Sequence, residues 1–452
     1  MAQPTTIQSP APHRALRPSA RQTLAALGLT AALLAAPAAA ASASALQGQT
    51  VEPGSNQDEA PTLQPGASYT GTFGEETAYY RVARTMEGST LHIGISSFDQ
   101  SGEHYDDATL RLSTLSGESC DDDTVDWHTS TAANLVRTAQ VRATAPHDPE
   151  HWQAVEACGS AEELLLAVEA NGEELIGQDY ELVVGEEPEP LNVDELRQDL
   201  DPDRWEDGLQ WQPLERDRDS ENTIEPGSSL HNAPLLEKGT TYDTSIEPGQ
   251  VHIYRIEAGW NEQIQAQAFF PEPSSELSES LGSWTDAHVG IISPYRGSAT
   301  PDSSAAPSEQ NLSSRIDDTR ATTLTAQTYP VTWSGRYMDR PHAEARNAST
   351  SGEHFIMVAA EPLEDDEEGF AIPYRLTADT FTTAETPEPM YEQDILQPPS
   401  GDSGSAEAGS VDAEQTGGIS TAAGIALSLG AFGLLLIAAG GLFLVRVMRR
   451  TD

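Results

Sequence analysis

The segments "APTLQPGASYTGTF", residues 60–73, and "APLLEKGTTYDTSI", residues 233–246, decide the fold of this chain. At an offset of 173 residues they share Ala, Pro, Leu, Gly and Tyr in the same order. One inserted residue later, "TAYYRVAR" (77–84) aligns with "VHIYRIEA" (251–258), so that Tyr80-Arg81-Val82 meets Tyr254-Arg255-Ile256. Repetition in fixed order indicates an internal duplication.

Each copy has the sequence pattern of short antiparallel strands. Apolar and polar residues alternate in "STLHIGISSF" and again in "EQIQAQAFF", and Gly/Pro turns such as "QPGAS" and "EKGTT" separate the strands. Glycine supplies the positive φ that such turns require. We therefore predict an all-β chain of two tandem antiparallel β-sandwiches of jelly-roll type, plus one C-terminal transmembrane helix.

The repeated Tyr-Arg motif has two interpretations, a binding site used twice or a strand used twice. Alternation along a strand places Tyr80 and Val82 on one face and Arg81 on the other. We expect the tyrosine in the core and the arginine outside among acidic residues, which favours a framework strand.

The order "LQPGASYTGTF", "AYYRV", "STLHIGIS" resembles the pre-peptidase C-terminal β-sandwich domains of secreted bacterial proteins. The second copy, from "NAPLLEKGTTYDTSI" to "EQIQAQA", is similar to the ectodomains of uncharacterised actinobacterial membrane proteins. Some of those relatives carry a von Willebrand factor A domain, whose D-x-S-x-S motif this chain lacks. The resemblance implies sandwich modules outside the cell and a membrane partner carrying such a domain.

Both ends of the chain carry targeting signals. Arg14, Arg17 and Arg21 precede an Ala/Leu run and a small-residue tract, which predicts a signal peptide over residues 1–45. Residues 417–445 contain no charge and are long enough to span a bilayer. Arg446, Arg449 and Arg450 flank this span on its cytoplasmic side, so the protein is predicted to be a single-pass cell-membrane protein with its N-terminal domains extracellular.

Composition shifts divide the rest of the chain. We expect a short N-terminal segment over 46–59 and sandwiches over 60–186 and 233–381. Between them lies an acidic, Trp-containing linker over 187–232, in which "NVDELRQDL" predicts a short helix capped by Asn192. A disordered stalk over 382–416 and a cytoplasmic tail over 446–452 complete the division.

The predicted extracellular part is strongly acidic. Of 24 Lys+Arg and 72 Asp+Glu, six arginines and one aspartate lie outside residues 46–416, which leaves 18 basic and 71 acidic residues and a net charge of −53. Such a field repels nucleic acid and attracts cations. It is also typical of a surface kept soluble in salt.

Cys120 and Cys158 are the only cysteines, and outside the membrane two cysteines most simply form a disulfide. Free metal-binding or redox thiols are the alternative, but the C-x-x-C spacing is missing. Calcium is the one cofactor that the sequence suggests, through oxygen ligands of clustered acids. The candidate ligands are Asp121, Asp122, Asp123, Asp106 and Asp107, and solvated loop acids are the alternative.

The histidines show no metal-binding spacing, and "GDSGS" (401–405) lies in the predicted stalk, where no rigid nucleophile site forms. We therefore expect a non-enzymatic cell-envelope protein whose sandwiches bind a protein partner or wall polymer. A hydrolase with an unrecognised site and a structural acidic surface protein are the two alternatives.

Overall fold

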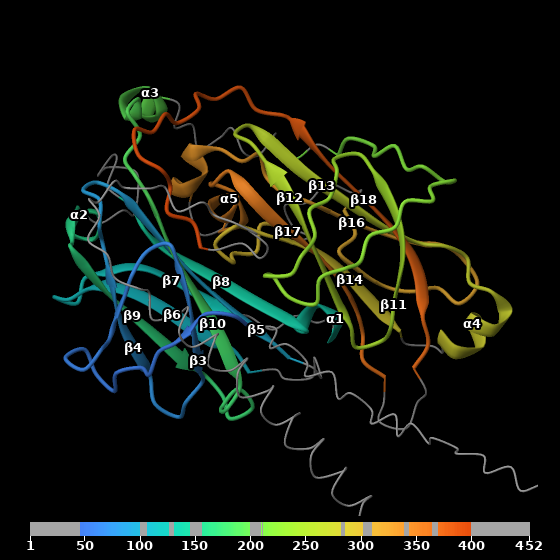
Figure 1. Cartoon of the computed structure of the whole chain (residues 1–452), viewed down its shortest axis with the longest axis horizontal. Coiled ribbons are helices and arrows are strands. Elements are labelled where there is room, and N and C mark those ends of the chain that lie inside the picture. Colours follow the sequence, from blue (N-terminus) through green and yellow to red (C-terminus); the bar gives the residue numbers. More distant parts are fainter. Residues whose placement is uncertain are drawn as a thin grey trace, which may run out of the picture. The chain divides into compact units, whose positions relative to one another are not determined.

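The computed structural model describes residues 46–99, 106–125, 131–144, 156–198, 209, 211–281, 285–301, 310–338, 343–363 and 369–398 (Figure 1). These residues belong to one compact unit. The predicted signal peptide, the span over 417–445 and the arginines Arg446, Arg449 and Arg450 lie outside them. Within the described ranges, no helix has the length and apolar character needed to cross a bilayer.

The first sandwich consists of two five-stranded sheets that enclose a core including Leu63, Tyr80 and Val82. One sheet has the order β1 (Gln49–Thr50), β3 (Ala67–Thr72), β10 (Asp179–Glu187), β5 (Thr90–Phe98) and β8 (Val136–Ala143). The other has the order β2 (Thr62–Leu63), β4 (Ala78–Ala83), β9 (Glu163–Ala170), β6 (Ala108–Thr114) and β7 (Ser119–Val125). Short helices α1 (Thr131–Asn134) and α2 (Glu156–Ser160) precede β8 and β9.

The second sandwich consists of two four-stranded sheets around a core including Tyr254, Ile256 and Tyr374. Its sheets have the orders β11 (Thr241–Ile246), β18 (Ile372–Thr382), β13 (Glu262–Phe270), β16 (Thr322–Gln327) and β12 (Val251–Ala258), β17 (Gly352–Ala360), β14 (Asp286–Ile292), β15 (Ser313–Arg315). The connections contain α4 (Ser275–Leu281), the 3-10 helix η2 (Trp333–Tyr337) and α5 (Ala343–Asn347).

The two sandwiches have the same topology, which agrees with the tandem arrangement predicted from the repeat. The order β3-β10-β5-β8 corresponds strand for strand to β11-β18-β13-β16, and β4-β9-β6-β7 corresponds to β12-β17-β14-β15. Gly66 and Gly239, the turn glycines of the repeat, have φ of 74° and 72°. A side chain at either position would be strained, so the glycine is explained by the turn.

The repeated Tyr-Arg motif is a framework strand in both copies. Tyr80 and Tyr254 are buried, and each hydroxyl lies 2.7 Å from the hydroxyl of a second core tyrosine, Tyr180 in the first copy and Tyr374 in the second. Arg81 lies on the opposite face. Mutual hydrogen bonding satisfies hydroxyls that burial would otherwise leave without partners.

The paired arginines also repeat their contacts, which the sequence did not reveal. Arg81 forms an ion pair with Glu163 at 3.5 Å, and Arg255 forms one with Glu353 at 2.8 Å. In each copy the glutamate lies on the neighbouring antiparallel strand, two residues from the arginine's direct partner. Cross-strand diagonal pairs of this kind stabilise a sheet modestly.

Two predicted boundaries differ from the structure because backbone pairing extends beyond the repeat. The N-terminal segment belongs to the first sandwich, since β1 pairs with β3 and Gly54 bridges Tyr79. Part of the predicted linker belongs to the second sandwich in the same way, since Thr223 bridges Asp243 and Gly227 bridges Ile253. The helix α3 (Val193–Gln198) forms as predicted.

The prediction of a disordered stalk from residue 382 is wrong for its first part. Residues 383–397, which we call the strap, follow β18 in an extended conformation and are held by specific bonds to both sandwiches. Leu396 bridges Glu186 at the end of β10, and Thr386 bonds Asn261. Proline-rich composition excludes internal secondary structure, but it does not exclude pairing with a folded neighbour.

Candidate functional site

The strongest concentration of buried charge lies where the first sandwich meets the second. Strands β10 and β5 are buried on both faces along most of their length. One face of each packs into the core, and the other is covered by the second sandwich. We call the side chains that meet there the interdomain cluster. It comprises His92, Gln140, Arg142, Glu181 and Glu187 from the first sandwich; His231, Ser293, Tyr295, Arg296, Arg336 and Asn347 from the second; and Tyr391 from the strap.

Two glycines make room for this contact. A Cβ on Gly94 would lie 1.9 Å from the carbonyl oxygen of Tyr295, and one on Gly185 would lie 2.0 Å from the Tyr295 ring. The same ring stacks on His92 with a centroid distance of 4.4 Å and an interplanar angle of 5°. The surface of the first sandwich is thus shaped to receive one aromatic side chain from the second.

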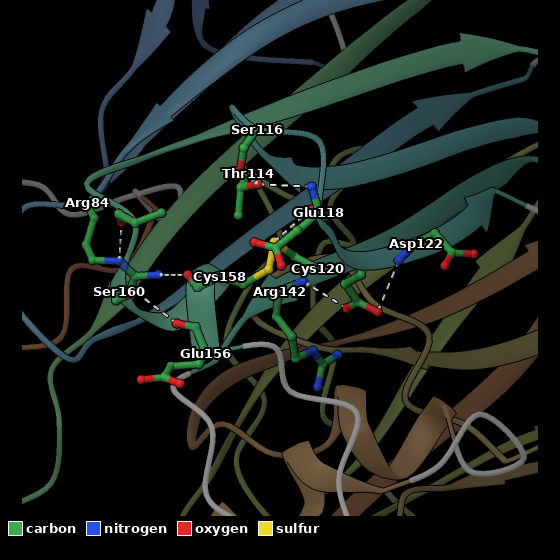
Figure 2. The surroundings of a disulfide bond; sticks show 12 residues. Arg84, Thr114, Ser116, Glu118, Cys120, Asp122, Arg142, Glu156, Cys158 and Ser160 are labelled. Atoms are coloured by element: carbon green, nitrogen blue, oxygen red, sulfur yellow. Dashed lines mark hydrogen bonds between the residues drawn. A yellow bond between two sulfur atoms is a disulfide. The ribbon is translucent and has the colours of Figure 1, made fainter. Parts of the chain in front are cut away.

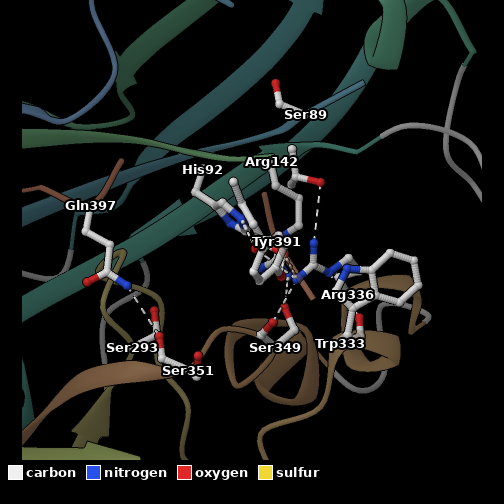
Figure 3. A network of polar contacts seen from close by, with 12 residues as sticks. Ser89, His92, Arg142, Ser293, Trp333, Arg336, Ser349, Ser351, Tyr391 and Gln397 are labelled. Carbon is white, nitrogen blue, oxygen red and sulfur yellow. Dashed lines mark hydrogen bonds and ion pairs between the residues drawn. The ribbon is translucent and has the colours of Figure 1, made fainter. Parts of the chain in front are cut away.

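Glu187 lies at the centre of the cluster and is fully buried. Its carboxylate lies 2.8 Å from Arg336, 3.3 Å from His92, and accepts a hydrogen bond from the Tyr391 hydroxyl. Burial by itself would raise the pKa of Glu187, but the Arg336 guanidinium, His92 and Tyr391 together lower it to about 2. Figure 3 shows Tyr391 beside His92 and Arg336.

Burial keeps His92 a neutral imidazole, and its neighbours fix the orientation of the ring. Its Nε2 faces Glu187, and its Nδ1 lies 3.2 Å from the amide nitrogen of Gln140, which can only donate. The Gln140 oxygen in turn accepts from the Ser293 hydroxyl of the second sandwich at 2.9 Å. Burial lowers the pKa of His92 to about 4, and this outweighs the opposing effect of Glu187.

A second buried carboxylate, Glu181, is contacted by a histidine and an arginine that follow it in the chain. His231 Nε2 lies 2.8 Å from both its oxygens, and Arg296 lies 3.4 Å from one of them. Arg296 has a φ of 69°, unusual for a residue with a side chain. Gly94 and Gly185 form the recess that receives Tyr295, which we call the glycine recess. The turn that places Tyr295 there also directs Arg296 to Glu181.

Arg142 extends the cluster to α5. Its guanidinium is fully buried and donates to the carbonyl oxygen of Arg346 and, at 2.5 Å, to the side-chain oxygen of Asn347. Arg346 itself reaches back to Asp121 of the first sandwich at 2.7 Å. The end of α5, in the second sandwich, is therefore fixed by two side chains of the first sandwich.

The predicted disulfide is present. Cys120 and Cys158 are joined, with their Cα atoms 5.6 Å apart, and the bond links β7 to α2 (Figure 2). Arg84 donates to the carbonyl oxygen of Cys158 at 2.8 Å. Because Cys120 directly precedes Asp121, the disulfide also fixes the strand from which Asp121 reaches Arg346.

The structure does not gather the five candidate calcium ligands into one site. Oxygens of Asp121 accept bonds from Arg346 and from the backbone of Arg142, and Asp123 accepts from the backbone of Gln140 at 2.9 Å. Asp122 lies between them on β7. Asp106 and Asp107 lie before β6; Asp106 accepts from the backbone N–H of Glu174, and Asp107 accepts from the side-chain amide of Asn171. Among the described residues, no three His, Cys, Asp or Glu side chains form a group suited to a metal ion.

The interdomain cluster was not predicted from the sequence, although two signals pointed to it. Arginine is scarce in this acidic chain, so arginines that follow strand-like runs, such as Arg296 after "GIISPY", carried information. The segment "DYELVVGEE" also places Glu181, Val183 and Gly185 on the face opposite the core residues, a mixture unlike a solvated surface. Neither signal identifies the partner, because the counter-charges lie far away in the sequence.

No protein-family model matches the sequence, and no curated protein matches it either. Solved structures with weak similarity include the CUB1-EGF-CUB2 domain of human MASP-1/3, which is 8% identical, covers 69% of this chain and 99% of that chain, and has a TM-score of 0.15. The CBM22-1-CBM22-2 tandem domain of Paenibacillus barcinonensis Xyn10C is 11% identical, with 69% and 84% coverage and a TM-score of 0.17. The ANX2 ectodomain of Arabidopsis thaliana is 8% identical, with 72% and 86% coverage and a TM-score of 0.18. Scores this low transfer no function, so the proposals below depend on the residues.

Proposed function

We propose that this is a non-enzymatic cell-envelope protein that presents its two sandwiches outside the membrane as one rigid binding unit. The partner is a protein or a wall polymer. The observation that carries the proposal is the interdomain cluster, which joins the sandwiches through buried charges instead of leaving them as independent modules. The pre-peptidase C-terminal relationship, the signal peptide and the single-pass anchor belong to the same proposal, and the repeat and the two chain ends support them.

The chemistry of the cluster favours a structural joint over catalysis. A general acid at neutral pH needs a raised pKa, whereas the pKa of Glu187 is lowered to about 2. A general base needs a free lone pair, whereas both nitrogens of His92 already face Glu187 and Gln140. Within the cluster, Glu187 and His92 are thus each committed to neighbouring side chains.

A rigid joint improves binding to an extended partner. Two modules held in a fixed orientation lose less conformational freedom when both contact the same polymer or protein. The net charge of −53 over residues 46–416 disfavours anionic partners and favours neutral or basic ones. We therefore expect a neutral wall polysaccharide or a basic protein surface to bind better than a phosphate-rich polymer.

The test is a co-sedimentation assay with the detergent-purified full chain and purified insoluble wall polymer, with calcium and with a chelator. Saturable binding that weakens in the Gly94→Ala variant, whose joint is disturbed, supports the proposal. Calcium-dependent binding would add a cation site among the acidic loops. Soluble fragments released from the polymer would establish a hydrolase instead.

A protein partner needs a separate arm of the same experiment. The purified chain is crosslinked on intact cell envelopes, and captured proteins are then tested as purified components for direct binding. Absence of binding to every polymer and every purified candidate would overturn the proposal in favour of a structural acidic surface protein.

A further inference from the structure

The strap bonds in turn to the second sandwich, to the segment between the sandwiches and to the first sandwich. Thr386 bonds Asn261 at 2.6 Å, the backbone of Met390 donates to Asn192 at 2.9 Å, and Leu396 exchanges two 2.9 Å backbone bonds with Glu186. Its course from β18 past α3 is visible in Figure 1. The strap therefore crosses the same junction that the interdomain cluster occupies.

One strap residue completes the interdomain cluster. The Tyr391 hydroxyl donates to Glu187, the carboxylate that also faces His92 and Arg336. Without this donor, a fully buried carboxylate oxygen loses one of its partners, and an incompletely satisfied buried charge is costly. Glu187 therefore links two events: the binding of the strap, through Tyr391, and the contact between the sandwiches, through Arg336.

The strap is much more weakly held than the sandwiches it joins. Apart from the two-residue bridge at Leu396 it belongs to no sheet, and Met390 and Leu396 are 54% and 36% exposed. Segments with few buried apolar contacts open at a small fraction of the global unfolding free energy. Because the strap follows β18, the last strand among the described residues, it can leave without disrupting any strand pair of the two cores.

We propose that the strap is a releasable clasp. Seated, it keeps the interface between the sandwiches closed; pulled away from its C-terminal end, it lets the interface open while both cores stay folded. The Gln397–Ser351 bond and the Leu396–Glu186 bridge are the first to break under such a pull, and the Tyr391, Met390 and Thr386 contacts follow one at a time.

Thiol labelling of the full chain tests this clasp, because both native cysteines are in the disulfide. Ser293→Cys places a reporter thiol in the buried interface, and Ala326→Cys places one in the core of the second sandwich. Leu396→Pro removes the N–H that donates to Glu186. Gln393→Pro is the matched control, since Gln393 is exposed and its N–H donates to no described group.

Leu396→Pro is expected to speed labelling at position 293 about tenfold, the equivalent of one net hydrogen bond, and to leave labelling at position 326 unchanged. Gln393→Pro is expected to change neither rate. Tyr391→Phe, which keeps the ring and removes only the hydroxyl, is expected to act in the same direction as Leu396→Pro. Equal acceleration at both reporter positions would show that the strap is an ordinary part of the fold. Unchanged labelling at position 293 in both Leu396→Pro and Tyr391→Phe would show that the interface stays closed without the strap contacts. Either result overturns the clasp.

Discussion

The outer face of the β3-β10-β5-β8 sheet and the outer face of its counterpart, β11-β18-β13-β16, have the same framework and opposite chemistry. With Tyr180 and Tyr374 as the common reference, the strand registers align His92 with Gln265 and Arg142 with Gln327. The same registers align Gly94 with Gln267, Gly185 with Asp379, and Glu181 with Arg375.

The two faces are covered by different partners. The first is covered by the second sandwich, which supplies Arg336 and Arg296 as counter-charges and His231 as a further polar contact. The second is covered by the chain's own backbone just before it, where the N–H of Gln212 donates to Gln265 at 3.2 Å. Glutamine suits a backbone cover because its amide matches N–H and C=O groups, whereas charges require charged side chains opposite. The duplicated framework therefore diverged according to what covers each face.

The largest expected effect comes from removing a counter-charge from the first face. Arg336→Met leaves Glu187 buried without its cation, and breaking a buried pair in this way costs about 3–5 kcal/mol. Urea unfolding measures the loss. Arg111→Met is the matched control. Arg111 pairs with Glu169 on an exposed side of the first sandwich, and such exposed pairs contribute less than about 1 kcal/mol. Similar losses in the two variants would contradict the assignment of the cluster as the joint.

The disulfide distinguishes the copies in a second way. Helix α2, which precedes β9, is fixed by Cys158, whereas α5, which precedes β17 in the same place of the second copy, is fixed by Arg142 and Asp121 of the first copy. Replacing both cysteines by serine reopens a 38-residue loop and is expected to cost about 3–4 kcal/mol of unfolding free energy. Reductant should destabilise the native chain equally and have no further effect on the variant. Unequal losses would mean that the serines themselves perturb α2.

The strand framework was predictable because it depends on local periodicity. Alternation placed Tyr80 and Tyr254 in the cores, and the presence of only two cysteines, both in the part of the chain predicted to lie outside the membrane, predicted their bond. The cluster was not predictable, because Glu187 and Arg336 lie 149 positions apart in the sequence and no local pattern encodes their contact. The prediction of disorder for the strap was wrong for a related reason. Composition indicates which structure a segment forms alone, but not which hydrogen bonds it makes with a neighbouring strand.

Acid should weaken the first face more than the second, because a histidine stands where the second copy has a glutamine. The pKa of His92 is about 4 in the folded chain and about 6.5 when unfolded, so the unfolded chain binds the proton first as the pH falls. The unfolding free energy that depends on neutral His92 is fully present above pH 6.5 and falls progressively toward pH 4, by about 3 kcal/mol. The charged groups facing His92 are Glu187, Arg336 and Arg142, and the pKa of Glu187 lies below this window.

The matched substitution is His92→Gln, which installs the residue of the second copy. Urea unfolding at pH 7, 6, 5 and 4 should show a shallower loss for the variant than for the native chain. His252 and His354, whose pKa values burial also lowers to about 4, remain in both proteins and cancel in the difference. Identical pH slopes would show that His92 does not titrate with folding.

The smallest expected effect tests the shape of the first face. Gly94→Ala puts a methyl group where the carbonyl oxygen of Tyr295 now lies, so the second sandwich must shift, at a cost of about 1–3 kcal/mol. Gly259→Ala is the control for alanine itself, because the nearest atom to its Cβ would be 3.5 Å away. The reciprocal change, Gln267→Gly, should cost no more than the about 0.5–1 kcal/mol of a glycine within a strand, because no sandwich docks on that position. A Gly94→Ala loss equal to that of Gly259→Ala would mean that the interface tolerates the methyl group, and the glycine recess would then have no part in fixing how the two sandwiches meet.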